Sequence, residues 1–199
     1  MQISKEEACG ISEKLDIVYL LDMSRHVSEA QLAKVKDYVK GSLSSYKISA
    51  EDVRVSIVPF GGSVSTAINF AAGVSPKAAN FYIDTSVLIG GDRNLNQALS
   101  YLNSDVFVTR SGSRPMAKKV VILITTGQAS DDDKLVLPAT ATLLKSQGVR
   151  IIVVGIGMNT IDDTLTGVAT DGDHIITIIF ENLPDTIGDL EQIIGELSG

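Results

Sequence analysis

The sequence predicts a doubly wound α/β fold: a mostly parallel six-stranded sheet with one antiparallel edge strand and helices on both faces. Three observations predict it. Runs of consecutive apolar residues, such as 120–124 and 151–154, are typical of parallel strands that are buried on both faces. Segments with apolar residues at helical spacing alternate with these runs. A Gly-Gly pair at 61–62, between two further strand-like runs, indicates an antiparallel hairpin at one edge of the sheet.

The order of elements follows from these patterns. Ser28 suits the N-cap of a helix, with Gln31 completing a capping box, and Pro138 is expected to kink a later helix or to mark its start. The predicted strands cover residues 16–22, 53–60, 64–70, 119–125, 150–155 and 174–180. The predicted helices cover residues 28–46, a short stretch from Ser75-Pro76, and residues 94–102, 131–146, 162–169 and 183–197.

Length and composition favour one globular domain. The chain has 199 residues, of which 44% are hydrophobic and 21% are charged, so it can form a large core. We expect residues 1–14 to form a polar lead-in and residues 15–199 to form a single domain. The net charge of −7 and the scattered basic residues argue against nucleic acid and anionic membranes as partners. No apolar run is long enough to insert into a bilayer.

In doubly wound sheets, the functional crevice lies beyond the carboxyl ends of the strands, where the strand order reverses. The loops that follow Leu21, Ile89 and Thr125 are therefore the candidate site. The first of these loops contains Asp22, Ser24 and His26, a set of polar residues directly after a buried strand.

At this point the sequence resembles the von Willebrand factor type A domain family, which includes integrin inserted domains, matrilins and the globular domains of collagen VI. The resemblance extends over about residues 15–197 and depends on several motifs in the right order. These motifs are Asp22-Met-Ser24, Val55-Ser-Ile-Val-Pro-Phe60, Gly90-Gly91 before Ala98-Leu99, Val120-Val-Ile-Leu-Ile-Thr-Thr-Gly127 and Val149-Arg-Ile-Ile-Val-Val-Gly-Ile-Gly157. It implies a Rossmann-like fold used in extracellular adhesion and matrix assembly.

The resemblance also implies a divalent-cation site, called MIDAS, which an acidic group of the partner completes. Asp22 and Ser24 match the first two positions of its Asp-x-Ser-x-Ser motif, but His26 replaces the second serine. Arg93 stands where the family has a metal-binding threonine, and Thr126 stands where it has a second aspartate. Since Mg²⁺ requires oxygen ligands that include carboxylates, these changes predict a degenerate site that holds no metal and needs no cofactor.

Two arrangements of Arg93 are compatible with this prediction. Its guanidinium could pair with Asp22 through charge-assisted hydrogen bonds and so replace part of the ion's role. Alternatively, Arg93 points to solvent, and backbone N–H groups of the first loop hold Asp22. A third possibility keeps a weak cation site, in which a small shift of the loop brings Asp92 close to Asp22 and Ser24.

Other candidate sites have simpler structural explanations. Asp131, Asp132 and Asp133 lack the ligand spacing of a calcium loop and suit the start of a helix. Ser24 and His26 lie too close in sequence for a catalytic pair, and no Gly-x-Ser-x-Gly motif occurs. We therefore expect no enzyme.

The first hypothesis is a secreted, non-catalytic protein–protein interaction module of the extracellular matrix or of cell adhesion. Its expected partners are matrix proteins or neighbouring domains of the same chain, bound without a bridging cation. The alternatives are a cation-dependent adhesion domain and an intracellular doubly wound enzyme or small-molecule binder. The resemblance also implies a disulfide partner for Cys9 after the last helix; Cys9 either pairs outside this sequence or is a free thiol.

Overall fold

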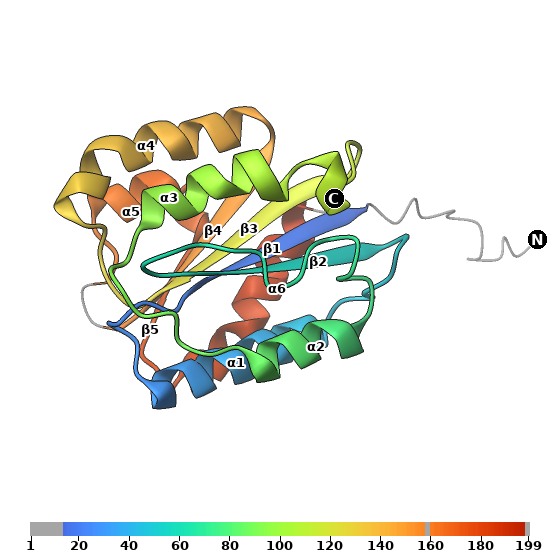
Figure 1. Cartoon of the computed structure of the whole chain (residues 1–199), viewed down its shortest axis with the longest axis horizontal. Coiled ribbons are helices and arrows are strands. Elements are labelled where there is room, and N and C mark those ends of the chain that lie inside the picture. The colour runs from blue at the N-terminus through green and yellow to red at the C-terminus, as the bar shows by residue number, and fades with distance from the viewer. Residues whose placement is uncertain (1–13, 158–159, 198–199) are drawn as a thin grey trace, which may run out of the picture.

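The computed structural model describes residues 14–157 and 160–197, so Cys9 and residues 1–13 of the predicted lead-in lie outside the described part of the chain. Five parallel strands form one sheet in the order β2-β1-β3-β4-β5 (Figure 1). The strands are β1 (Leu15–Asp22), β2 (Val53–Phe60), β3 (Lys118–Thr125), β4 (Val149–Ile156) and β5 (Ile175–Ile178). The predicted doubly wound α/β architecture is thus confirmed.

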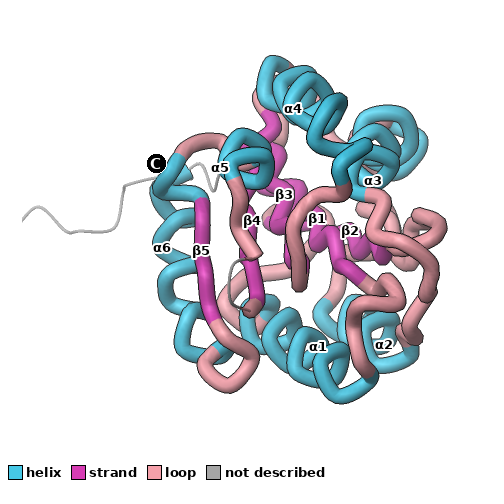
Figure 2. The backbone as a smooth tube through the Cα atoms, turned by 90° about the vertical axis from the view of Figure 1, so that its left-hand side faces the viewer, coloured by secondary structure: helices cyan, strands magenta, loops and turns pink. Residues whose placement is uncertain are grey.

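Helices cover both faces of this sheet. The helices are α1 (Glu29–Leu43), α2 (Pro76–Thr85), α3 (Leu95–Tyr101), α4 (Asp131–Ser146), α5 (Asp163–Val168) and α6 (Ile187–Leu197). Figure 2 looks onto the carboxyl ends of the strands, with α1 and α2 below the sheet and α3 and α4 above it. Within the described ranges, no helix combines the length and the apolar character that crossing a membrane would require.

Side chains of β1, an interior strand, alternate between two apolar cores. Every residue of β1 is buried, as expected for a parallel strand covered on both faces. Ile17, Tyr19 and Leu21 belong to the core between the sheet and the helices α1, α2 and α6. Val18 and Leu20 belong to the other core, between the sheet and the helices α3, α4 and α5. This double burial leaves the polar residues at the two ends of β1 in need of partners.

The prediction of a sixth, antiparallel strand over residues 64–70 is wrong. This segment makes two isolated antiparallel bridges with β2, at Ile57–Ile68 and at Phe60–Val64. Ile57 still exchanges good hydrogen bonds with it, because its N–H donates to the Ile68 carbonyl at 3.0 Å. Pro59 is the next residue of β2 that faces the segment, and it has no N–H to donate. The segment therefore covers the edge of β2 without forming a regular ladder.

Other boundaries differ by a few residues from the prediction. The last strand is shorter than residues 174–180, and a 3₁₀ turn at Leu183–Thr186, with Pro184 in it, precedes α6. Pro138 lies inside α4 and neither starts nor ends it, because the inner face of the helix is buried on both sides of the proline. The capping box of Ser28 and Gln31 is confirmed.

Asp133 has a role that the sequence analysis did not assign. It lies in the first turn of α4, but its carboxylate accepts the backbone N–H groups of Leu95 at 3.1 Å and Asn96 at 3.2 Å. It thereby caps the neighbouring helix α3, whose own N-cap residue, Asn94, makes no side-chain capping bond. This cap fixes the start of α3 and, with it, the loop that carries Arg93.

A buried ion pair closes the amino-terminal end of β1. The carboxylate of Asp16 is fully buried and accepts hydrogen bonds from the Arg114 side chain at 2.9 Å and from its backbone N–H at 2.6 Å. The same guanidinium also donates to carbonyl oxygens of Leu15 and Asp52. Arg114 thus neutralises the Asp16 carboxylate and also donates hydrogen bonds to the backbone carbonyl oxygens of Leu15 and Asp52.

We predict that Arg114→Leu lowers the free energy of unfolding by about 3–5 kcal/mol, because it leaves a buried carboxylate without a partner. Urea denaturation followed by circular dichroism measures this change. Arg110→Leu is the matched control, since Arg110 pairs with Asp105 on the exposed surface and its loss is expected to cost at most about 1 kcal/mol. Equal losses for the two variants would contradict the prediction.

Candidate functional site

The carboxyl ends of β1 and β3 meet two loops at one end of the sheet, the end that faces the viewer in Figure 2. Backbone hydrogen bonds tie these loops together. The N–H of Gly90 donates to the Met23 carbonyl at 3.0 Å, and the N–H of Arg25 donates to the Gly91 carbonyl at 3.0 Å. Gly90 and Gly91 both have positive φ angles, of 74° and 69°, which glycine adopts without strain. The double glycine therefore holds the loop of Arg93 against the loop of Asp22.

Asp22 lies at the centre of the site. Its side chain is 1% exposed, and one carboxylate oxygen accepts the backbone N–H of Ser24 at 3.1 Å. The other oxygen accepts Nε of Arg93 at 2.6 Å, a short charge-assisted hydrogen bond. Both carboxylate oxygens of Asp22 are thus engaged by groups of the protein itself.

Asp22, Thr126 and Gly127 surround the side chain of Arg93. Its side chain is 12% exposed, and Nη2 donates to Oγ1 of Thr126 at 3.0 Å. Thr126 in turn donates from its backbone N–H to the Asp22 carboxylate at 3.3 Å. Gly127 provides the space, because a Cβ atom there would lie 2.5 Å from Nη1 of Arg93. The guanidinium therefore fills the crevice that these loops enclose.

The charge state of Asp22 depends on this arginine. Burial disfavours the carboxylate and would raise its pKa, but the charge and hydrogen bond of Arg93, with help from Ser24, lower the pKa below its ordinary value. Asp22 is therefore ionised at neutral pH. The carboxylate and the guanidinium form a compensated pair with no net charge.

Of the two arrangements of Arg93 that the sequence analysis left open, the structure contains the one in which Arg93 contacts Asp22. The alternative in which Arg93 points to solvent is wrong, although Ser24 does supply one of the backbone N–H groups which that alternative invoked. Asp92 is 66% exposed and forms an ion pair with Arg25. No contact among the described residues joins Asp92 to Asp22 or to Ser24.

His26 and Ser24 take up separate positions. The hydroxyl of the buried Ser24 accepts the backbone N–H of His26 at 3.4 Å, and no contact joins it to the imidazole in the described structure. The His26 side chain is exposed at the rim of a hollow of about 300 Å³ beside Arg93. His26, Asp92, Arg93, Asn94, Gln128, Ser130 and Asp132 line this hollow.

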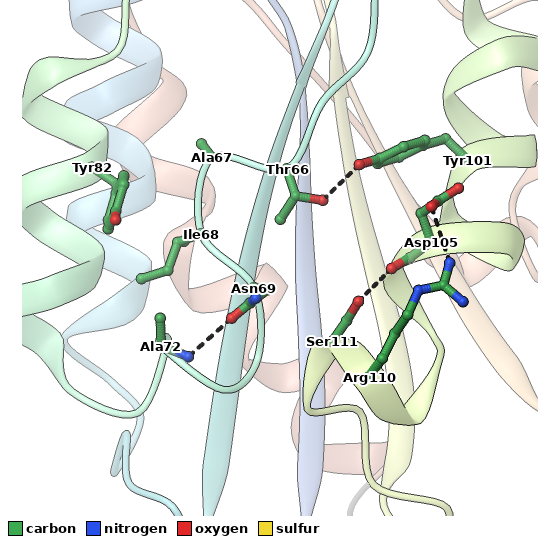
Figure 3. Close-up of a pocket in the computed structure, with 10 residues that line it drawn as sticks. All are labelled: Thr66, Ala67, Ile68, Asn69, Ala72, Tyr82, Tyr101, Asp105, Arg110 and Ser111. Carbon is green, nitrogen blue, oxygen red and sulfur yellow. Dashed lines mark hydrogen bonds and ion pairs between the residues drawn. The ribbon is translucent and has the colours of Figure 1, made fainter.

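A second hollow lies at the β2 edge of the sheet, away from this crevice. It has a volume of about 380 Å³ and lies between Tyr82 of α2 and Tyr101 of α3 (Figure 3). Thr66 and Tyr101 share a hydrogen bond of 3.1 Å across it, and Arg110 pairs with Asp105 at its rim. Its charged side chains thus already have partners. The remaining lining residues are Ala67, Ile68, Asn69, Ala72 and Ser111.

Two features of the site escaped the sequence analysis. Thr125 contributes a hydroxyl at 3.3 Å from the Asp22 carboxylate, although a threonine at a strand end carries no distinctive signal. Asp133 positions the Arg93 loop through its cap on α3, and only contact across the two helices reveals it. For the Asp16–Arg114 pair at the other end of β1, the sequence does contain a signal, because an acidic residue at the start of a buried apolar run needs a partner.

Known proteins have sequences similar to this chain. The Collagen alpha-6(VI) chain of Homo sapiens is 30% identical over 155 residues, which are 78% of this chain and 7% of that protein. Matrilin-1 of Gallus gallus is 26% identical over 162 residues, 81% of this chain and 32% of that protein. This chain therefore spans less than a third of either relative.

Solved structures agree on the fold. Proximal thread matrix protein 1 from the mussel byssus superposes with a TM-score of 0.82 at 24% identity, over 89% of this chain and 47% of that one. Another structure of the same mussel protein is described as having a zinc-occupied MIDAS motif. At this level of identity, the likeness shows the fold alone.

The profile of one family, the von Willebrand factor type A domain, matches residues 16–193, which is nearly the whole of the described structure. The chain belongs to the von Willebrand factor type A domain family.

Proposed function

We propose that this chain is a non-catalytic protein–protein interaction module of the extracellular matrix or of cell adhesion, and that it binds partners without a bridging divalent cation. One observation carries the second half of the proposal: the Arg93 guanidinium donates to Asp22 at 2.6 Å, in the crevice where the family holds its ion. The proposed partners are matrix proteins or neighbouring domains of the same chain, and the proposed location is extracellular.

The residues at the crevice do not fit a divalent cation. Mg²⁺ prefers octahedral oxygen ligands, usually with one or two carboxylates. Asp22 is the one carboxylate that the described contacts place in the crevice, and both of its oxygens already accept hydrogen bonds. The permanent positive charge of Arg93 would repel an ion at this position. Thr126 offers a hydroxyl, which donates to Asp22, where the family has an acid.

The relatives support the first half of the proposal. The names of the collagen VI chain and matrilin-1 place similar sequences in matrix proteins. The separation of Ser24 from the His26 imidazole supports a role other than hydrolysis, because nucleophilic catalysis requires a base in contact with the nucleophile. The contact of Asp92 with Arg25 gives no support to a cation site built from Asp22, Ser24 and Asp92.

Calorimetric titration with Mn²⁺ tests cation independence. We expect no saturable binding to the natural chain at micromolar Mn²⁺, because Arg93 occupies the crevice. A variant with Arg93→Thr, Thr126→Asp and His26→Ser regains the oxygen ligands of the family and is expected to bind Mn²⁺ and to melt at a higher temperature with it. His26→Ser alone is the control and is expected to resemble the natural chain. Micromolar binding of Mn²⁺ by the natural chain would refute the proposal.

The ion pair also predicts how stability depends on pH. Arg93 lowers the pKa of Asp22 in the folded chain below the value of about 3.9 that an aspartate has in an unfolded chain. The ionised carboxylate therefore contributes fully to the free energy of unfolding above this unfolded pKa, and the contribution is lost as the pH falls through the lower pKa of the folded state. In Arg93→Leu, the buried carboxylate lacks its partner, so this variant is expected to lose about 3–5 kcal/mol of stability at pH 7. The difference between the two proteins is expected to narrow toward pH 3.

Urea denaturation at intervals from pH 7 to pH 3 measures this difference. Arg25→Leu is the matched control, because Arg25 pairs with Asp92 on the surface and the expected change is at most about 1 kcal/mol at every pH. A gap between the natural chain and Arg93→Leu that stays constant over this range would show that the arginine acts through packing, without stabilising the ionised carboxylate.

A further inference from the structure

The two edges of the sheet are finished in different ways. Residues 64–73 run along β2 and bond to its outward backbone groups, as in the donation from Val55 N–H to the Gly73 carbonyl at 2.9 Å. At the other edge, β5 is the last strand, and Figure 2 shows α6 running alongside it. An uncovered strand edge presents free N–H and C=O groups that can pair with another extended segment.

The pairing with β4 determines which groups of β5 are free. The carbonyl of Ile178 accepts the N–H of Gly157 at 2.7 Å, so the backbone of Ile178 faces β4. Since backbone direction alternates along a parallel strand, Ile176 also faces β4, and Ile175 and Thr177 face the open edge. Within the described ranges, neither Ile175 nor Thr177 has a backbone hydrogen bond outside the strand pairing.

A groove of about 420 Å³ accompanies this open edge. It lies between β5 and α6, with Thr177 on one side and Gln192 and Ile193 on the other. Its charged lining residues, among those described, are Asp173 and Asp189, and neither forms an ion pair there. The groove therefore offers main-chain donors and acceptors, an apolar wall and uncompensated negative charge.

We infer that the β5 edge is a docking site for an extended segment of a partner protein that carries basic residues, which adds to the sheet as a further strand. Main-chain bonds to Ile175 and Thr177 supply the pairing, and basic side chains of the segment meet Asp173 and Asp189. A second copy of β5 would bring the same two carboxylates into the groove, so the charge favours a basic partner over self-association.

This inference goes beyond the proposed function, because the β5 edge is separate from the crevice of Asp22 and Arg93. It rests on the proposed interaction role only in requiring that a protein partner exists. If the test at β5 fails, the conclusion from the Mn²⁺ titration still holds. If Mn²⁺ binds at the crevice, the inference about the β5 edge still holds.

The test is an NMR titration of the full chain with a capped seven-residue peptide, Lys-Val-Lys-Val-Lys-Val-Lys. We expect saturable shifts concentrated at the amides of β5 and α6, and slower hydrogen exchange of the Thr177 amide. The same peptide N-methylated at every residue cannot donate those main-chain bonds in any register and is expected to bind at least about tenfold more weakly. A peptide with Glu in place of Lys is expected to bind more weakly for reasons of charge.

Variants of the chain supply the matched comparison. Thr177→Pro removes the outward N–H and is expected to weaken binding about tenfold, whereas Thr177→Val keeps it and is expected to bind as the natural chain does. Asp189→Asn is expected to weaken binding of the lysine peptide alone. If Thr177→Pro fails to fold, the N-methylated peptide still tests the same hydrogen bonds on the natural chain.

Several results would overturn the inference. Equal binding of the N-methylated peptide, or shifts centred away from β5, would exclude strand addition at this edge. Sedimentation could show a dimer of the natural chain that the substitution Thr177→Pro dissociates. That result would assign the edge to a second copy of the chain. Binding that appears only in a variant starting at residue 14 would assign it to the chain's own first residues. Absence of saturable binding at millimolar peptide would refute the inference.

Discussion

A buried carboxylate has to be neutralised, and this constraint organises both ends of β1. Asp16 and Asp22 lie near opposite ends of β1, an interior strand of a sheet that is apolar on both faces. Each would be costly to bury alone. Arg114 neutralises the first and Arg93 the second, each through a charge-assisted hydrogen bond from Nε. An aspartate–arginine pair thus lies at each end of β1.

The two arginines also have a common origin. Both belong to residues 93–114, the segment that crosses one face of the sheet through α3. Pinning this segment to β1 at its beginning and at its end fixes how α3 lies on the core that Leu95 and Leu99 help to form. Asp133 adds a third attachment, from α4 to the start of α3. The position of the Arg93 guanidinium is therefore a consequence of how the whole layer is anchored.

Sequence patterns predicted the layered architecture because apolar spacing reports burial directly. The five parallel strands, the capping box at Ser28 and the candidate loops all follow from local signals. The sixth strand failed because the run 64–70 has strand-like composition, while the missing N–H belongs to its neighbour, Pro59. Local composition does not record what the adjacent strand can donate.

The site divides in the same way. The sequence identified Asp22 and Arg93 as possible partners, but it could not decide between this ion pair and an Arg93 that points to solvent, because a loop side chain can take either direction. The space that receives the guanidinium was not predictable, since Gly127 matters only through its distance to Nη1 of an arginine far away in the sequence. The caps and pairs made by Asp133 and Arg114 likewise join residues that no short motif connects. Contacts over such sequence separations require the fold itself.

Charge balance distinguishes the crevice from the rest of the sheet. At the crevice, Asp22 and Arg93 cancel, and Arg25 and Asp92 cancel beside them, so among the described residues that line the adjoining hollow Asp132 is the one carboxylate without an ion pair. At the β5 edge, Asp173 and Asp189 stay uncompensated next to free backbone groups. Association steered by charge needs an excess of one sign on the surface that is approached. Under the proposed function, Arg93 stabilises the crevice in place of an ion, and the uncompensated charge at the β5 edge supplies the electrostatic preference for a partner.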